Sequence, residues 1–345
     1  MIEKLAKWSQ EEFFGLPWRK NRSLYGTLVS EIMLQQTTVA TVVKHYERFL
    51  REYPNPLAVA NASEERLLIS WKGLGYYRRA KNLRKACSFF CERFNGRIPL
   101  DFEVLKSAPG IGDYTANALL AIGADTRALA LDANLERVLA RLYGIEDEKG
   151  AKLQKKLQKL FTEGAIGGEM SLIGSRNFHE SLMDLGRNFC KANKASCSLC
   201  PLSLNCVGFK SGNPLSFPVS KEKAKKEIFD LTLLRLLHFK KGKLLVFKKN
   251  EKQWLAGQLE VPTFILESQD PKLEQYPGID FENHHWLPEY KTLITKYRIT
   301  NKVLVVNEDD LKLLGVEESR YQWRELNLKR LNLSTGSLKA LELIK

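Results

Sequence analysis

Long hydrophobic runs are missing from this sequence of 345 residues. No stretch of about eighteen apolar residues occurs, so no membrane-spanning helix is expected. Residues 1–10 are charged and contain no apolar segment of signal-peptide length. Hydrophobic residues nevertheless make up 44% of the chain, which is too many for a disordered protein. We therefore expect a soluble cytoplasmic chain with about two or three domains.

Negative charges are in short supply. The chain carries 54 Lys and Arg residues against 40 Asp and Glu residues, which gives a formal net charge of +14. An excess of this size favours a polyanionic partner, because binding to phosphates releases the counterions that surround a nucleic acid. The alternative is a generally basic soluble protein. We favour nucleic acid as the partner.

Cysteine is also scarce, and its distribution is uneven. Four of the six cysteines lie within residues 190–206, with the spacing C-x6-C-x2-C-x5-C. A small secreted protein built on disulfides would be shorter and would spread its cysteines more evenly. Four thiolates at this spacing can instead close around one zinc ion or one [4Fe–4S] cluster, and the spacing alone leaves both open. The predicted ligands are Cys190, Cys197, Cys200 and Cys206.

The hydrophobic periodicity changes once along the chain. Residues 1–206 predict an all-α region, residues 207–227 a basic linker, and residues 228–345 an α+β domain. The predicted helices of the first region cover 28–49, a segment capped by Ser63, 78–94, 102–108 capped by Asp101, 113–122 and 134–143. In the last region the predicted strands cover 232–237, 243–248, 260–266 and 302–307, and short helices cover 311–314 and 337–344.

A glycine-rich turn separates two of the predicted helices. In the stretch A-P-G-I-G-D-Y, Gly110 and Gly112 permit a tight turn and the close approach of another molecule. The helix that follows begins near Asp113, where free N–H groups form an anion site for a DNA phosphate. An ordinary turn between helices is the alternative.

Several short sequences together carry a resemblance to a known family. They are L-P-W-R at 16–19, S-E-I-M-L-Q-Q-T at 30–37, G-L-G-Y-Y at 73–77, L-D-A-N at 131–134 and M-D-L-G at 183–186. With the glycine turn and the cysteine loop, they resemble the helix-hairpin-helix glycosylases of the endonuclease III superfamily, and among these the adenine DNA glycosylases of the MutY type. The resemblance implies a helix-hairpin-helix core at 1–206 in which the cysteines hold a structural [4Fe–4S] cluster.

The same resemblance implies a substrate and a location. The substrate would be double-stranded DNA with adenine opposite 8-oxoguanine or guanine, from which a monomeric enzyme releases the adenine. A bacterial enzyme of this family would work in the cytoplasm, in association with the nucleoid.

Two acidic residues are the predicted catalytic pair. Breaking a glycosidic bond requires a protonated leaving group and stabilisation of a cationic sugar, as in glycoside hydrolysis. Glu31 lies in an apolar helix, where burial raises the pKa of a carboxyl group and keeps it protonated as a general acid. Asp132 is expected to stay ionised and to stabilise the sugar. The family implies that they meet; the alternatives are an exposed helix carboxylate for Glu31 and a helix N-cap for Asp132.

Tyr114 and Asn134 complete the predicted catalytic set. Bifunctional members of the family have a lysine at the place of Tyr114, and this lysine forms a Schiff base with the sugar. A tyrosine cannot do so, and a monofunctional glycosylase is therefore expected, with Tyr114 hydrogen-bonded to the carboxylates or to the sugar. Asn134 matches a family position that orients the site.

The resemblance assigns further residues to the extruded base and to the space that it leaves. Arg19 and Glu180 are expected to contact the base edges, and Trp18 to form an apolar wall, with core packing as its alternative. Gln36 and Tyr76 match the residues that intercalate beside the opposite base; packing on its own helix is the alternative for Tyr76. The basic residues that follow are expected to contact phosphates or to form a solvated face, and they are Arg78, Arg79, Lys81, Arg84 and Lys85.

The last third resembles the Nudix-like domain that these enzymes append to recognise 8-oxoguanine. G-Q-L-E-V-P at 257–262 is similar to the family strand G-L-W-E-F-P. No carboxylate cluster of the kind that binds Mg²⁺ in Nudix hydrolases is present in the sequence, so binding without hydrolysis is expected. Tyr297, Arg298 and Ile299 stand in place of the family's F-S-H loop, which leaves open whether 8-oxoguanine is preferred over guanine. Arg298 is expected to reach a guanine edge or a phosphate, or to be a surface strand residue.

Three other functions are consistent with parts of the sequence. The first is a bifunctional glycosylase and lyase for oxidised pyrimidines, against which Tyr114 and Glu31 argue. The second is a DNA-binding protein without catalysis, which would need neither Glu31 nor Asp132. The third is an iron–sulfur electron carrier, which would not use the basic helices or the glycine turn.

Overall fold

The chain divides into two units. The computed structural model describes residues 1–219, 227–281, 287–327 and 331–344, so residues 220–226 of the predicted linker lie outside it. The domain limits predicted at 206 and 228 stay predictions. The first unit comprises Met1–Ala62, Gly73–Gly75 and Arg79–Glu222, and the second comprises Ser63–Lys72, Tyr76–Arg78 and Lys223–Lys345.

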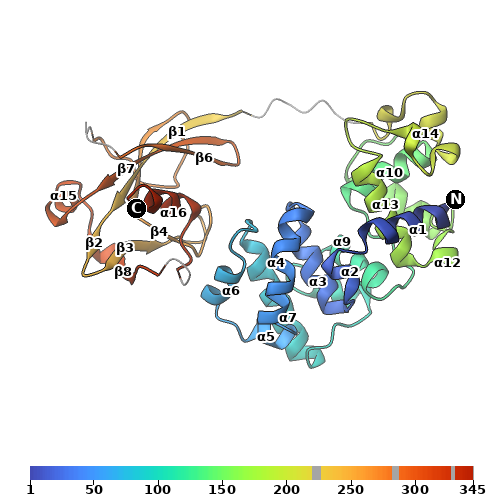
Figure 1. Cartoon of the computed structure of the whole chain (residues 1–345), viewed down its shortest axis with the longest axis horizontal. Coiled ribbons are helices and arrows are strands. Elements are labelled where there is room, and N and C mark those ends of the chain that lie inside the picture. Colours follow the sequence, from blue (N-terminus) through green and yellow to red (C-terminus); the bar gives the residue numbers. More distant parts are fainter. Residues whose placement is uncertain (220–226, 282–286, 328–330, 345) are drawn as a thin grey trace. The chain divides into compact units, whose positions relative to one another are not determined.

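Helices are the main regular elements of the first unit (Figure 1). Short polar side chains begin several of them: Asp101 accepts a hydrogen bond from the N–H of Val104 at 2.8 Å, as its capping position predicted. No helix that the structure describes is long and apolar enough to cross a bilayer. The helices are α1 (Ile2–Phe13), α2 (Pro17–Lys20), α3 (Leu24–Leu34), α4 (Val39–Glu52), α5 (Pro56–Ala60), α7 (Arg78–Phe94), α8 (Phe102–Ser107), α9 (Asp113–Ala118), α10 (Ala133–Tyr143), α11 (Ala151–Thr162), α12 (Met170–Ile173), α13 (Ser175–Asn188) and α14 (Val207–Lys210).

The helix predicted over residues 28–49 is wrong in its continuity, because the structure divides it into α3 and α4. Between them, Gln36 has a backbone φ of 56°, in the left-handed region that an α-helix does not use. Thr38 then caps α4 by accepting a hydrogen bond from the N–H of Thr41 at 3.4 Å. Apolar spacing continues across the break, and periodicity alone therefore does not reveal it.

The core of the first unit forms where α1, α10 and α11 pack around α13 and its neighbours. His179 on α13 is fully buried, and burial lowers its pKa to about 4, so the ring is neutral near pH 7. Its Nδ1 donates to the carbonyl of Ser175 at 2.7 Å, and its Nε2 accepts from the N–H of Ala130 at 3.0 Å. His179 thereby holds the segment that leads to Asp132.

Residues 207–219, which were predicted as the start of a linker, are folded onto the first unit. They contain α14, and the Nε of Arg141 on α10 donates to the carbonyl of Phe217 at 3.0 Å. The N–H of Lys149 donates to the carbonyl of Val219 at 3.0 Å. This segment therefore has fixed partners as far as Val219.

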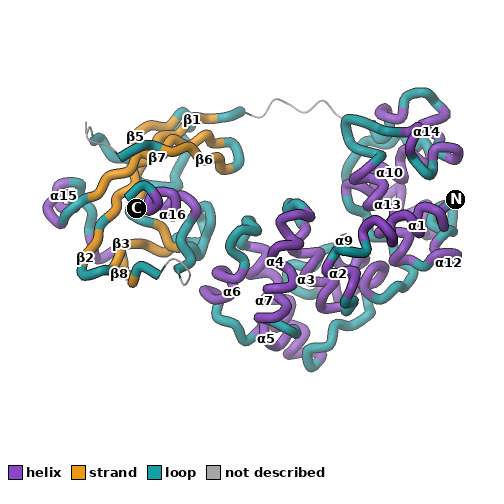
Figure 2. Tube along the Cα trace, in the orientation of Figure 1, coloured by secondary structure: helices purple, strands orange, loops and turns teal. Residues whose placement is uncertain are grey.

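The described part of the second unit contains two four-stranded sheets, which confirms the predicted change from all-α to α+β (Figure 2). One sheet has the order β5-β1-β7-β6, in which β1 and β7 are parallel; in the other, β3 pairs with β2, β4 and β8. The strand predicted over 260–266 is wrong in its continuity, since Pro262 lies at a break between β4 and β5. The elements are α6 (Glu64–Ser70), β1 (Phe229–Leu237), β2 (Phe239–Lys240), β3 (Lys243–Lys248), β4 (Leu259–Glu260), β5 (Thr263–Ser268), β6 (Tyr290–Ile294), β7 (Tyr297–Val305), α15 (Glu308–Leu313), β8 (Gln322–Glu325) and α16 (Thr335–Glu342).

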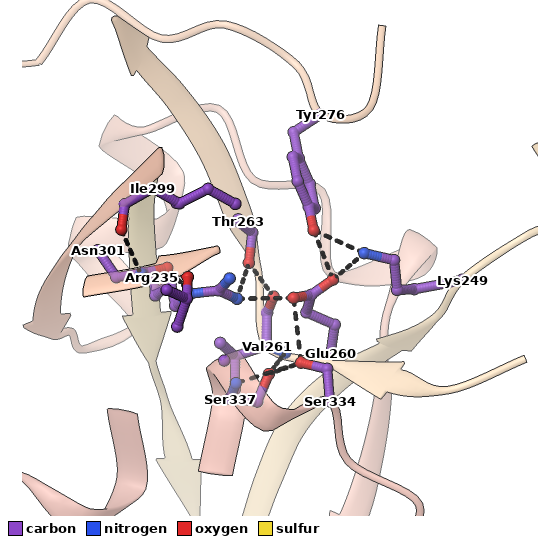
Figure 3. Close-up of polar contacts among 12 residues, drawn as sticks. Arg235, Lys249, Glu260, Val261, Thr263, Tyr276, Ile299, Asn301, Ser334 and Ser337 are labelled. Carbon is purple, nitrogen blue, oxygen red and sulfur yellow. Dashed lines mark hydrogen bonds and ion pairs between the residues drawn. The ribbon is translucent and has the colours of Figure 1, made fainter. Parts of the chain in front are cut away.

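A buried ionic network lies in the second unit and centres on Glu260 (Figure 3). One carboxylate oxygen accepts from Arg235 at 2.7 Å and from Ser334 at 3.1 Å; the other accepts from Lys249 and from Tyr276. Burial alone raises the pKa of Glu260, but the two cations outweigh it and lower this pKa to about 2. Glu260 is therefore committed to internal contacts of the fold.

We expect Glu260→Gln to destabilise the second unit by about 3–5 kcal/mol, because two buried cations lose their counter-charge. Chemical denaturation followed by circular dichroism measures this change, with the exposed Glu325→Gln as the control. Since folding lowers the pKa of Glu260 from 4.5 to about 2, its contribution to stability is present above pH 4.5 and is lost as the pH falls toward 2. Equal stabilities of the two variants at pH 7 would contradict the role of the network.

Candidate active site

A cavity of about 470 Å³ in the first unit gathers most of the predicted site residues. Its walls come from α2, α3, α9, α10 and α13 and from the segment between α3 and α4. Glu31 and Asp132, which are far apart in the sequence, line the same cavity. The predicted residues in its lining are Trp18, Arg19, Glu31, Gln36, Tyr114, Asp132, Asn134 and Glu180, and lining residues that were not predicted include Leu34, Met183, Asp184 and Arg187.

Glu31 is a buried acid with a neutral hydrogen-bond donor beside it. The residue is 8% exposed, on the last part of the apolar helix α3, and the hydroxyl of Tyr114 donates to its Oε2 at 2.6 Å. Burial raises the pKa of Glu31 to about 7, the bond from Tyr114 lowers it in part, and Asp132 and Glu180 raise it further. Burial likewise raises the pKa of Tyr114, so that its proton is retained. Glu31 can therefore carry a proton near neutral pH.

Asp132 both caps α10 and faces the cavity. Its Oδ1 accepts from the backbone N–H groups of Asn134 at 3.0 Å and Leu135 at 2.7 Å, and its Oδ2 accepts from the Asn134 side chain at 2.9 Å. The helix N-terminus favours a negative charge at this place. The Asn134 side chain is in turn held by Arg137, whose Nη2 donates to its Oδ1 at 2.8 Å. Three hydrogen-bond donors thus fix the position of the Asp132 carboxylate.

Two of the residues predicted to hold a base, Arg19 and Glu180, take part in a network of ion pairs at the cavity wall. Arg19 donates to Asp184 at 2.9 Å, and its Nε lies 3.5 Å from the carboxylate of Glu180. Arg22, which sequence reasoning missed, binds both oxygens of Glu180, at 2.7 and 3.0 Å. Glu180 is therefore held in one orientation at the cavity wall. Trp18 lines the cavity and also packs edge-on against Tyr46, and its role as a wall for an extruded base stays a prediction.

Some predicted residues lie outside the cavity lining. Tyr76 is 56% exposed and has a backbone φ of 46°, so it shares the left-handed conformation of Gln36. Gly110 has φ +82°, and a Cβ there would approach Asn82 to 2.5 Å, which only glycine avoids. Gly112 is the residue before α9, the helix that carries Tyr114. The glycine turn therefore positions the helix that carries Tyr114, and its contact with a DNA phosphate stays a prediction.

The four predicted cysteine ligands follow α13 and are free, partly exposed thiols. Burial, and to a smaller extent the thiols of Cys190, Cys206 and Cys197, raise the pKa of Cys200 to about 11. No group of three or more described His, Cys, Asp or Glu side chains has the arrangement of a metal-ion site. Arg141 donates to the sulfur of Cys190 at 3.3 Å, which places a buried cation beside this donor set. The chemistry of the donor set, four thiols with a buried cation beside one of them, is compatible with an anionic iron–sulfur cluster.

Arg298, predicted to contact DNA or to lie on a strand surface, is exposed on β7. Its guanidinium is paired with both oxygens of Asp230, each at 2.9 Å. Tyr297 and Ile299 are buried on either side of it. Among these three residues, only Arg298 presents its side chain to solvent.

Comparison with known proteins relates the chain to DNA repair enzymes. Residues 29–163 match the HhH-GPD superfamily base excision DNA repair proteins. The chain is 34% identical over 285 residues to the adenine DNA glycosylase of Buchnera aphidicola subsp. Schizaphis graminum, covering 82% of this chain and 76% of that one. It is 36% identical to the thymine/uracil-DNA glycosylase of Pyrobaculum aerophilum, covering 60% of this chain and 91% of that one.

A solved structure shows the same relationship in the fold. Endonuclease III trapped as a covalent intermediate with DNA superposes with a TM-score of 0.51 and 26% sequence identity. The superposition covers 61% of this chain and 94% of endonuclease III. The predicted helix-hairpin-helix fold class is thereby confirmed.

The hydrogen bond from Tyr114 lowers the pKa of Glu31, so we expect Tyr114→Phe to raise this pKa above about 7. Titration of labelled glutamate side chains by NMR measures the shift, and Glu31→Gln identifies the resonance. A pKa that stays the same or falls would show that Tyr114 does not act on the carboxyl group.

Proposed function

Because the chain belongs to the adenine DNA glycosylases of the HhH-GPD superfamily, we propose that it hydrolyses the glycosidic bond of adenine opposite 8-oxoguanine or guanine, with Glu31 and Asp132 as the catalytic residues. The observation that carries this proposal is the cavity that Glu31, hydrogen-bonded to Tyr114, lines together with Asp132. Its volume is in the range of small-ligand sites.

The two acids divide the reaction between them. Glu31 donates its proton to the adenine ring, and the bond between the ring nitrogen and the sugar breaks with its electron pair leaving on the base. Asp132 stabilises the cationic sugar, and water then adds at the same sugar carbon and releases a proton. Extrusion of the base from the duplex, which the reaction needs, costs a few kcal/mol.

Tyr114 favours hydrolysis over strand cleavage. A lysine at this place would supply an amine for a Schiff base with the sugar, whereas the phenol of Tyr114 is bonded to Glu31 and retains its proton. The product is therefore an abasic site in an intact strand.

Thymine or uracil opposite guanine is a second candidate substrate. The match to a thymine/uracil-DNA glycosylase, which covers 91% of that enzyme, favours it. At the cavity wall, Glu180 can only accept hydrogen bonds and Arg19 can only donate them, so a bound base must offer a donor to Glu180 and an acceptor to Arg19. We favour adenine, because the match to an adenine enzyme extends over 82% of this chain.

We further propose that Cys190, Cys197, Cys200 and Cys206 hold a [4Fe–4S] cluster. A cluster bound by four thiolates has no open ligand position for substrate, so it would stabilise the loop after α13. Arg141, which contacts Cys190 and the carbonyls of the loop, ties this loop to α10 and so to Asp132.

A glycosylase assay on duplexes that differ only in one base pair tests the reaction. We expect base release from A:8-oxoguanine and A:G duplexes, with strand breakage only after alkali, and less release from T:G and U:G. Glu31→Gln should lower the single-turnover rate at least about 100-fold, since a general acid contributes about that much, while the Kd for DNA stays similar. The wild-type rate should fall as the pH rises through 7, where Glu31 loses its proton.

The stability of Glu31→Gln provides the control for folding. Because folding raises the pKa of Glu31 from 4.5 to about 7, the wild type loses stability as the pH rises from about 4.5 to about 7 and keeps the full loss above pH 7, and glutamine avoids this cost. The variant should therefore be the more stable protein at pH 8.5. An unstable variant would mean that Glu31 serves folding, and pyrimidine release above adenine release would favour the second candidate.

The iron and sulfide content of the purified protein tests the proposed cluster. The purified protein should be brown and contain about four irons and four sulfides per chain, and Cys200→Ser should lower the iron content and the melting temperature. Cys91→Ser, outside the loop and partly exposed like the loop cysteines, is the matched control. A colourless protein with one zinc per chain would replace the iron–sulfur cluster by a zinc site.

A further inference from the structure

Arg79 was expected at a phosphate or on a solvated face, and both expectations are wrong. The residue lies in the first turn of α7, is 8% exposed, and directs its guanidinium inward. It donates to neutral oxygens from two separate loops. The acceptors are the carbonyls of Ile32 at 2.8 Å, Met33 at 2.8 Å, Gln35 at 2.5 Å, Leu74 at 2.9 Å and Gly75 at 3.1 Å, and the hydroxyl of Thr37 at 2.9 Å.

The first loop is the break between α3 and α4. The last carbonyls of a helix have no partner within the helix, and Arg79 supplies donors to those of Ile32 and Met33. It also binds the carbonyl of Gln35, immediately before Gln36 with its φ of 56°. Left-handed backbone is costly for a residue with a side chain, so it persists only where neighbouring contacts impose it.

The second loop precedes α7 and has the same feature. Gly75 has a φ of 68° and Tyr76 a φ of 46°, so two consecutive residues are left-handed. Arg79 binds the carbonyl of Gly75, immediately before Tyr76, and that of Leu74. The guanidinium of Arg79 therefore donates hydrogen bonds to the carbonyl immediately before each of the two proposed intercalating residues.

We infer that Arg79 is a positioning residue that sets the backbone of Gln36 and Tyr76 together, so that both side chains are ready to fill the space left by an extruded base. The inference rests on the proposed base extrusion. It concerns the step before chemistry, and it gives Arg79 no contact with DNA. The planar guanidinium can serve several carbonyls at fixed angles, whereas a lysine ammonium is a single point with three donors.

The test separates extrusion from bond cleavage by using two substrates and the full-length protein. One is an A:G duplex, and the other holds the same adenine in a one-nucleotide bulge with no opposite base. Single-turnover rates are measured for wild type, Arg79→Lys and Arg93→Gln, which removes an exposed cation in the last turn of the same helix and controls for charge. A third measurement uses 2-aminopurine in place of the adenine, since its fluorescence rises when it unstacks.

We expect Arg79→Lys to lower the rate on the A:G duplex at least about tenfold, because unstacking costs a few kcal/mol, and to affect the bulge much less. The 2-aminopurine signal of the A:G duplex should fall in parallel, and Arg93→Gln should change neither the ratio of the two rates nor the 2-aminopurine signal. Thr37→Val removes one acceptor of Arg79 with little change of shape, and it should give a smaller loss of the same kind.

Equal losses on both substrates with an unchanged 2-aminopurine signal would overturn the inference and make Arg79 a general structural residue. If Arg79→Lys does not fold, Thr37→Val decides by the same comparison. Failure of the proposed function is distinct, because the wild type would then release no adenine from either substrate, while the 2-aminopurine signal would still report on Arg79.

Discussion

The site depends on one constraint, which is that a carboxyl group is buried with a tyrosine hydroxyl as its hydrogen-bond donor. Burial favours the protonated form of Glu31, and the 2.6 Å bond from Tyr114 favours the ionised form. The balance leaves the pKa near 7, where a general acid is effective. A cation in place of Tyr114 would favour the ionised form more strongly and remove the proton that the reaction needs.

The other acids of the cavity have different hydrogen-bond and ion-pair partners, and this difference supports the roles that we propose. Glu180 and Asp184 are paired with Arg22 and Arg19, so their charges are compensated within the protein. Asp132 is held by N–H groups at a helix N-terminus, which suits the proposed role of an anion that faces a cationic sugar. Acids in such different surroundings can perform different steps in one cavity.

Much of the fold and of the candidate site could be predicted from local sequence chemistry and from the family resemblance. The features that could not be predicted depend on contacts between residues that are distant in the sequence. Asp101 at a cap and Lys243–Lys248 as a strand were read correctly, because their causes are local. The break after Leu34 could not be read, because the guanidinium that completes the helix end comes from Arg79, far along the chain. Arg22 was missed for the same reason: its partner Glu180 is distant in sequence, and nothing local marks the pair.

In the second unit, the acidic residue of a stretch that resembles the family has a structural role. Glu260 stands in the stretch that is similar to G-L-W-E-F-P, yet its oxygens are occupied by Arg235, Lys249 and their neighbours (Figure 3). A carboxylate so enclosed cannot also bind a solvated metal ion, because its donors would have to be withdrawn from two buried cations. Any contact of this unit with DNA that we propose is therefore assigned to surface side chains and not to Glu260. On β7, Arg298 would have to exchange its exposed pairing with Asp230 for a contact with DNA, an exchange that costs little since exposed ion pairs are weak.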